Sequence, residues 1–301
     1  MNGTLLQCMS TVTLGQPFEV WKTRMGRHRS ETSAESLRHL IRTGGMRSLY
    51  LGTGPKLVES ATKGGVLLVV KDALADNLRR LGFSQTAAGF IGGAGGGVAQ
   101  TLVMGPCTFV VTALVLGDGK HSTVSVSDFV AATWRAKGLR GFYPGCSAIA
   151  ARQASNWASR VGFTEAVRAR IAAFFHGDPQ CRLSMREEAA AGIIGGVLSC
   201  WNHPFEVARI EMQARAIAGE VELPMSQVLR AVHAEYGMCG LFQGLLPRMG
   251  LNVWLTLFMV SGIHVTRQLR ESSERVESVV SGGSMVRQLR ETSERESVRL
   301  A

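Results

Sequence analysis

Long apolar stretches alternate with short polar connectors along most of the chain. Beyond a first stretch that precedes Pro17, the apolar, Gly-rich ranges are 87–104 and 189–201, and the other long helical ranges are 55–78, 148–175 and 247–269. They give six segments close to the length of about 20 residues that a helix needs to cross a bilayer. Charged residues fall at the segment ends and at a few interior points. This pattern favours membrane-spanning helices over the alternative, a soluble helical repeat protein.

Three shorter amphipathic stretches lie between the long ones, at 36–41, 129–134 and 228–232. Each follows a polar connector and precedes the next long segment. The order of elements is therefore the same three times: a long helix, a short amphipathic helix and a second long helix. The sequence predicts an all-α protein without a strand.

Two landmarks support a threefold internal repeat. Similar segments surround Pro17, Pro106 and Pro204, which are spaced by 89 and 98 residues. Each is followed by an aromatic-x-Gly triplet that ends at Gly52, Gly145 or Gly244, with spacings of 93 and 99 residues. Because two independent landmarks keep one period, we interpret the chain as three copies of one unit.

Composition narrows the function classes. The chain of 301 residues contains 35 glycines, and Gly89, Gly93 and Gly97 have the four-residue spacing that lets membrane helices pack closely. The net charge of +10 fits nucleic acid, an anionic lipid surface or an anionic substrate, and does not choose among them. Six cysteines form no CxxC pair and have no histidine at zinc spacing, so no metal or cofactor is expected. No nucleophile–base pair falls in the long helices, which argues against an enzyme.

The motif Pro-x-Glu-x-x-Lys/Arg, complete in the first and third units and reduced to its proline in the second, resembles the threefold signature of the mitochondrial carrier family, over residues 3 to 270. Four stretches, 13–23, 59–68, 152–160 and 201–213, are similar to the citrate/2-oxoglutarate branch of that family. The resemblance implies six transmembrane helices in a three-fold pseudosymmetric barrel, with short matrix-side amphipathic helices. The expected units are repeat 1 (1–81), repeat 2 (82–180), repeat 3 (181–270) and a charged tail (271–301).

The resemblance also implies a function. We expect a multi-pass protein of the mitochondrial inner membrane that exchanges citrate for 2-oxoglutarate by alternating access. Its partners would be a small anionic carboxylate and membrane lipid such as cardiolipin, and it would act as a monomer. No secretory signal or Arg-rich presequence is visible, so targeting information is expected within the chain itself.

Residues near the three prolines are expected to form a gate on the matrix side. A proline inside a spanning segment removes one hydrogen bond and kinks the helix. The expected gate residues are Pro17, Glu19, Lys22, Pro106, Pro204, Glu206 and Arg209. In the family, the acidic position of one repeat pairs with the basic position of the next, so Glu206 should meet Lys22. The second repeat has Thr108 and Val111 at its two charged positions, which predicts a weakened gate with one ion pair instead of three.

A substrate site is expected on the second long helix of each unit. Ionisable residues inside a membrane usually face a cavity and serve function. Counting from the landmark glycines places Glu59, Arg152 and Leu251 on one level and Ser60, Gln153 and Asn252 on the next. The resemblance assigns substrate contacts to six residues: Glu59, Lys63, Leu67, Arg152, Gln153 and Arg248. Lys63, Arg152 and Arg248 together could neutralise a tricarboxylate, which arginine can bind bidentately.

Several alternatives remain open at this stage. Glu59 and Lys63 could simply neutralise each other, and Arg248 after Pro247 could be a helix-start feature like Lys56 after Pro55. The substrate could be another di- or tricarboxylate or an acidic amino acid. The basic connector 22–29 could instead bind mitochondrial DNA, as in a nucleoid protein. The tail repeats the segment 267–275 at 287–295, and its composition predicts a solvated extension.

Overall fold

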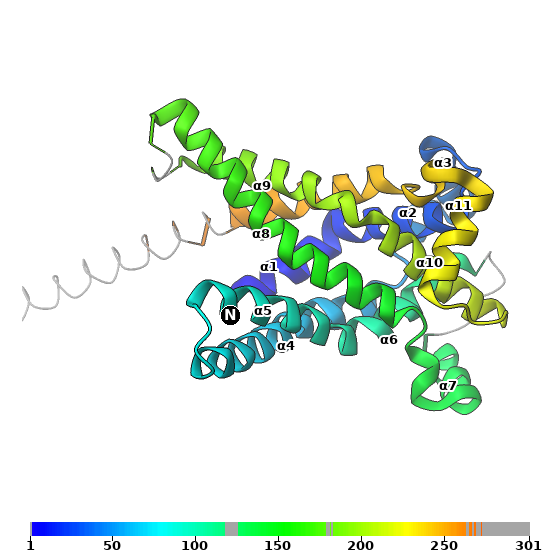
Figure 1. Ribbon diagram of the computed structural model, residues 1–301. Coiled ribbons are helices and arrows are strands. Elements are labelled where there is room, and N and C mark those ends of the chain that lie inside the picture. The colour runs from blue at the N-terminus through cyan, green and yellow to red at the C-terminus, as the bar shows by residue number, and fades with distance from the viewer. Residues whose placement is uncertain are drawn as a thin grey trace, which may run out of the picture.

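The computed structural model describes residues 2–117, 126–178, 181, 183–262, 265–266, 268 and 272. This described part of the chain is helical and contains no strand. The expected tail 271–301 lies outside the described residues except for Ser272. Figure 1 shows a bundle of long helices with the short helices α3, α7 and α11 at one end.

The three units repeat the same order of helices. The first contains α1 (Asn2–Ser10), η1 (Thr11–Gly15), α2 (Gln16–Arg27), α3 (Ser33–Gly44), η2 (Gly45–Tyr50) and α4 (Thr53–Arg80). The second contains α5 (Gln85–Ala99), α6 (Thr101–Leu116), α7 (Val126–Lys137), η3 (Gly138–Phe142) and α8 (Cys146–His176). The third contains α9 (Met185–Leu198), η4 (Ser199–Asn202), α10 (His203–Ala218), α11 (Met225–Leu241) and a last helix at residues 245–262.

Each first long helix is broken shortly before its proline. A π-helical segment, Thr11–Gly15, precedes Pro17, and a 3-10 segment, Ser199–Asn202, precedes Pro204. In the second unit the break lies at Gln100, and Pro106 sits inside α6. Because proline fits the first turn of a helix, α2 and α10 begin next to theirs. The expected distortion is therefore present, and it lies on the N-terminal side of each proline.

The landmark glycines join the three units into a closed ring. Gly52, Gly145 and Gly244 have positive φ angles of 74°, 73° and 84°, which favour glycine. A Cβ atom on Gly52 would lie 2.9 Å from Val111 of the second unit. The same atom on Gly145 or Gly244 would lie 3.2 Å from the carbonyl oxygen of Arg209 or Lys22, respectively. Lys22, Val111 and Arg209 occupy the same place five residues after each proline. The ring of contacts therefore has the expected three-fold pseudosymmetry.

Glycines of α5 let this helix pack closely on two neighbours. Cβ atoms on Gly92 and Gly96 would lie 2.8 Å from the Lys71 and Leu67 carbonyl oxygens of α4. On its other side, Gly97 faces the indole of Trp157 on α8. Small residues permit such approach, and the dispersion contacts it brings hold helices together in lipid.

Apolar residues pack between neighbouring units beneath the short helices. One buried cluster contains Val20, Leu40, Leu49, Val111 and Val115. The other contains Ala148, Val207, Ala208, Val228 and Val232. These contacts fix the end of the bundle at which the three prolines lie.

Hydropathy alone identifies one spanning candidate among the described residues. The range Gln85–Leu116, 32 residues long with a mean hydropathy of 1.8, passes a test on length and composition. The other long helices carry the charged residues described below, which lower their mean hydropathy. Among the described helices, the threefold order of long helices supports the six expected spans.

Candidate substrate site

A central cavity of about 700 Å³ lies between the long helices of all three units. Its charged lining residues are Glu19, Lys22, Lys56, Glu59, Lys63, Arg152, Glu165, Glu206, Arg209 and Arg248. Six cations thus face four carboxylates. Buried charges need partners, because the desolvation of an unpaired ion is costly. The pairing of these ten groups therefore decides which charges are free to meet a ligand.

Three of the six cations are held by carboxylates through hydrogen bonds. Lys22 donates to Glu19 at 2.9 Å. Lys56 donates to both carboxylate oxygens of Glu59, at 3.1 and 3.0 Å. Arg209 donates to Glu206 Oε1 at 2.9 Å. Because charge-assisted hydrogen bonds are strong, these three cations are committed to the protein.

The other three cations are held more loosely. Lys63 Nζ lies 3.5 Å from Glu59 Oε1, beyond good hydrogen-bond geometry. Arg152 Nε lies 3.0 Å from Glu206 Oε2, yet neither atom forms a hydrogen bond. Arg248 makes no ion pair with the described residues and binds neutral groups instead. These three are the cations that the sequence assigned to substrate.

Ion pairs close the end of the cavity near the prolines. Lys22 Nζ lies 2.8 Å from Glu206 Oε1, and their side chains are only 7% and 2% exposed. The second unit contributes polar contacts without charge. Gln213 donates to Thr108 Oγ1 at 3.1 Å, and Arg209 donates to Thr112 Oγ1 at 3.3 Å. The structure thus places Glu206 with Lys22 and leaves the second unit without an ion pair at its two substituted positions.

A further layer of ion pairs lies beyond this point, and the sequence analysis did not expect it. Glu211 of α10 accepts hydrogen bonds from Arg27 at 2.7 Å and Arg29 at 3.0 Å. Arg27 is the last residue of α2 and Arg29 lies two residues beyond it, so both reach Glu211 from the end of the first unit's proline-containing helix. These pairs lie outside the motif positions for which one ion pair was expected, and they add a second charged contact between the first and third units. Motif positions alone do not reveal a contact made by residues beyond the motif.

Three polar residues, one in each unit, link the two long helices of their unit. They are Ser60, Gln153 and Asn252, which directly follow Glu59, Arg152 and Leu251 in the sequence. Ser60 Oγ lies 3.0 Å from Thr11 Oγ1, and Gln153 donates to Gln100 Oε1 at 2.7 Å. Asn252 donates to the carbonyl oxygen of Gly196 at 3.0 Å. In each unit, a polar side chain thus links the two long helices at this level. Of the residues assigned to substrate, Gln153 has its amide group engaged by such a link.

Leu67 and Lys56 lie in places that the sequence did not indicate. Leu67 is buried against Gly96 of α5 and does not line the cavity, unlike the other five residues assigned to substrate. Lys56 does line it and bridges Glu59 to Glu19, whose Oε1 lies 3.8 Å from Lys56 Nζ. The signal for Lys56 was its position, because it stands four residues after Gly52 as Arg248 stands four after Gly244.

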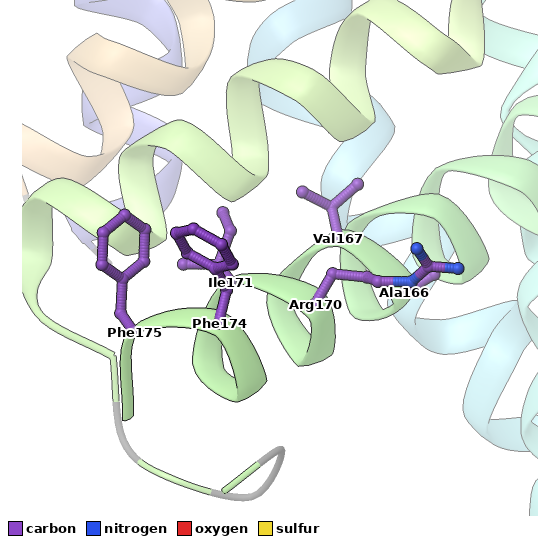
Figure 2. A pocket seen from close by; sticks show the side chains of 6 residues that line it. All are labelled: Ala166, Val167, Arg170, Ile171, Phe174 and Phe175. Atoms are coloured by element: carbon purple, nitrogen blue, oxygen red, sulfur yellow. The ribbon is translucent and has the colours of Figure 1, made fainter. Parts of the chain in front are cut away.

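A second hollow, of about 520 Å³, runs along one face of α8 (Figure 2). Its lining residues all come from that helix: Ala166, Val167, Arg170, Ile171, Phe174 and Phe175. Apart from Arg170, these lining residues are apolar, and Phe174 is 83% exposed. Such a face has few polar groups that could orient a small solute. The central cavity is therefore the candidate substrate site.

Comparisons with known proteins agree with the geometry. The family model described as mitochondrial carrier protein matches residues 3–81, 83–173 and 182–271, which are three consecutive copies. The chain belongs to the mitochondrial carrier family. As a member, it is a multi-pass protein of the mitochondrial inner membrane, and the family's proteins are transporters.

Several curated relatives are similar over most of their length. The citrate/oxoglutarate carrier protein of Saccharomyces cerevisiae is 35% identical over 270 residues, which cover 86% of this chain and 85% of that protein. The mitochondrial 2-oxodicarboxylate carrier of Rattus norvegicus is 26% identical, with 79% and 83% covered. The tricarboxylate transport protein of Saccharomyces cerevisiae is 24% identical, with 78% and 83% covered.

Proposed function

We propose that this carrier exchanges citrate for 2-oxoglutarate across the mitochondrial inner membrane by alternating access. The observation that supports this most is the division of the cavity cations. Lys63, Arg152 and Arg248 have no hydrogen-bonded carboxylate among the described residues, whereas Lys22, Lys56 and Arg209 do. Three available cations in one cavity match the charge of a tricarboxylate. The names of the relatives support carboxylates as the substrate class.

Binding would exchange one set of carboxylates for another. A carboxylate of the substrate can displace Glu59 from Lys63 and Glu206 from Arg152, since neither contact has hydrogen-bond alignment. Glu206 also pairs with Lys22 at the closed end of the cavity. A substrate anion bound to Arg152 would therefore change the charge that Glu206 and Lys22 experience. In this way, substrate binding would affect the ion pair of the matrix gate. The gate residues proposed earlier act in this step.

The nucleoid function receives little support from the connector. Arg24 is paired with Glu31 at 2.6 Å, and Arg27 and Arg29 are paired with Glu211. The side chains of Arg24 and Arg29 are 6% and 5% exposed. Phosphate binding requires accessible cations whose charge is not already compensated. DNA binding that persists near physiological salt and is lost on substitution of these arginines would revive this alternative.

The proposal is tested by exchange in proteoliposomes. Purified protein is reconstituted with internal 2-oxoglutarate, and uptake of labelled citrate is compared with a panel of di- and tricarboxylates and acidic amino acids. We expect citrate uptake that depends on the internal anion and falls strongly in Lys63→Gln, Arg152→Gln and Arg248→Gln. Lys137→Gln, which alters an exposed cation at the surface pair with Glu222, is the matched control. No citrate uptake, while another carrier works in parallel, would refute the proposal.

A further inference from the structure

Arg248 is held by two neutral residues at the start of α10. Its Nη2 donates to the amide oxygen of Asn202, and its Nη1 lies 3.4 Å from His203 Nδ1. Both partners are almost fully buried, at 1% exposure each, and Arg248 is 5% exposed. A buried arginine usually meets a carboxylate. Here the two hydrogen-bond partners of the guanidinium are neutral, and no carboxylate of the described residues lies within ion-pair distance.

The surroundings of both partners fix the atoms that they present to Arg248. His203 Nε2 lies 2.9 Å from the carbonyl oxygen of Gln243, which can only accept, so Nε2 carries the hydrogen. In the neutral ring, Nδ1 then offers a lone pair to Arg248. The Asn202 amide nitrogen donates to Ser155 Oγ at 3.0 Å, which turns its oxygen towards the guanidinium. A flipped amide would place donors against donors.

The first unit shows what distinguishes this arrangement. Gln16 stands before Pro17 as His203 stands before Pro204, and its Nε2 donates to the Leu51 carbonyl oxygen at 2.5 Å. Leu51 precedes its landmark glycine as Gln243 does. However, Gln16 Oε1 has no hydrogen-bond partner, because Lys56, the counterpart of Arg248, turns to Glu59 instead. The second unit has Gly105 and Ile149 at these two positions. Among the three units, only the third has a cation at this position that is bonded to neutral acceptors, namely Arg248 with Asn202 and His203.

Asn202 also connects Arg248 to the other cavity arginine. Its amide nitrogen lies 3.3 Å from the backbone carbonyl oxygen of Arg152. One side chain thus touches the guanidinium of Arg248 and the backbone from which Arg152 projects. Because both contacts come from one planar amide, the relative position of the two arginines is constrained. Fixed cations lower the entropic cost of binding a ligand with several carboxylates.

We propose that Asn202 and His203 are positioning residues that form a neutral cradle for Arg248. The cradle directs the guanidinium into the cavity and leaves its charge for a substrate carboxylate. This inference rests on the proposed function, because it assumes that Arg248 binds a carboxylate of the substrate. A carboxylate in place of either cradle residue would act as an internal competitor for the substrate.

A double-mutant cycle tests the cradle. Asn202→Asp, Arg248→Gln and the combined variant are reconstituted, and the citrate concentration for half-maximal exchange is measured. Asn202→Asp should raise this concentration about tenfold, whereas in the Arg248→Gln background it should add less than about twofold. Gln7→Glu adds the same charge to the same cavity from α1, and the side chain of Gln7 is not bonded to Arg248, so its effect should be additive with that of Arg248→Gln. Additive effects of Asn202→Asp would overturn the cradle.

Variants of His203 keep the inference testable if Asn202→Asp does not fold. His203→Gln retains a donor for the Gln243 carbonyl oxygen, as Gln16 donates to Leu51 in the first unit, and its amide oxygen can accept from Arg248, so this variant should preserve citrate affinity. His203→Leu should weaken it severalfold. Equal affinities of the two variants would count against the cradle. Absence of exchange by the unchanged protein would instead refute the proposed function, which separates the two failures.

Discussion

Lys22 and Glu206 bring the first helices of the first and third units together, with their charged atoms 2.8 Å apart and their side chains buried. Glu206 also meets Arg209 at 2.9 Å and Arg152 at 3.0 Å. One carboxylate thus compensates cations from all three units. It is the point at which the candidate site and the candidate matrix gate share a residue.

Replacing Glu206 with Gln should destabilise the folded protein. Three cations would lose their shared carboxylate, and breaking a buried ion pair by removal of one partner costs about 3–5 kcal/mol. Thermal unfolding in detergent measures the effect. Lys137→Gln breaks an exposed pair, whose contribution is about 0–1 kcal/mol, and serves as the control. Equal melting temperatures for the two variants would contradict the role given to Glu206.

Replacing Lys56 with Gln should weaken both stability and citrate affinity. Glu59 is fully buried, and Lys56 supplies its two hydrogen bonds. Without Lys56, Glu59 would draw Lys63 closer, so that less of this cation's charge remains for substrate. Melting temperature and half-maximal citrate concentration report the two effects. Combining Lys56→Gln with Glu59→Gln should recover stability, and failure of this rescue would show that Lys56 acts elsewhere.

The link between Gln100 and Gln153 predicts a non-additive pair. Gln100 also donates to the Lys63 carbonyl oxygen at 3.0 Å, so it joins α4 to α8. Gln100→Leu alone leaves the buried amide of Gln153 unsatisfied, at a cost of about 1–3 kcal/mol. The double variant with Gln153→Leu should cost less than the sum of the single changes. Citrate exchange by the double variant then asks whether Gln153 contacts substrate: retained exchange assigns it to structure alone.

Two glycines of α5 should respond differently to alanine. The Cβ of Gly96→Ala would lie 2.8 Å from the Leu67 backbone carbonyl oxygen, so helices α4 and α5 must move apart. Such overpacking costs about 1–3 kcal/mol. The Cβ of Gly89→Ala meets nothing within 4 Å, so alanine is expected to be neutral or to stabilise the helix. Thermal unfolding compares the two. A larger loss for Gly89→Ala would refute this account of the packing.

The sequence anticipated the helices well because their signals are local and repeated. Spans expected at 55–78 and 148–175 appear as Thr53–Arg80 and Cys146–His176. The landmark glycines Gly52 and Gly145 stand immediately before these helices, where the chain adopts a positive φ angle that favours glycine. The sequence missed the break at Gln100, which carries no proline or glycine of its own.

Leu67 shows why the candidate site was less predictable. It stands one turn beyond Lys63, so helical spacing places both near one face. Close packing with the glycines of α5 turns this part of α4 away from the cavity, and Leu67 fills the contact instead. Orientation around a helix depends on which neighbour approaches most closely, and that is a property of the assembled bundle.

By itself, the sequence indicated the threefold repeat, the family and the set of cations that we propose as the substrate site. Tertiary structure decided how those cations are paired. Lys56 and Lys63 flank the same carboxylate in the sequence, yet only Lys56 hydrogen-bonds to it. Electrostatic energies fall with distance and depend on burial, so the availability of a charge follows from its three-dimensional neighbours. The chain specifies the charges, and the fold determines which of them can meet a substrate.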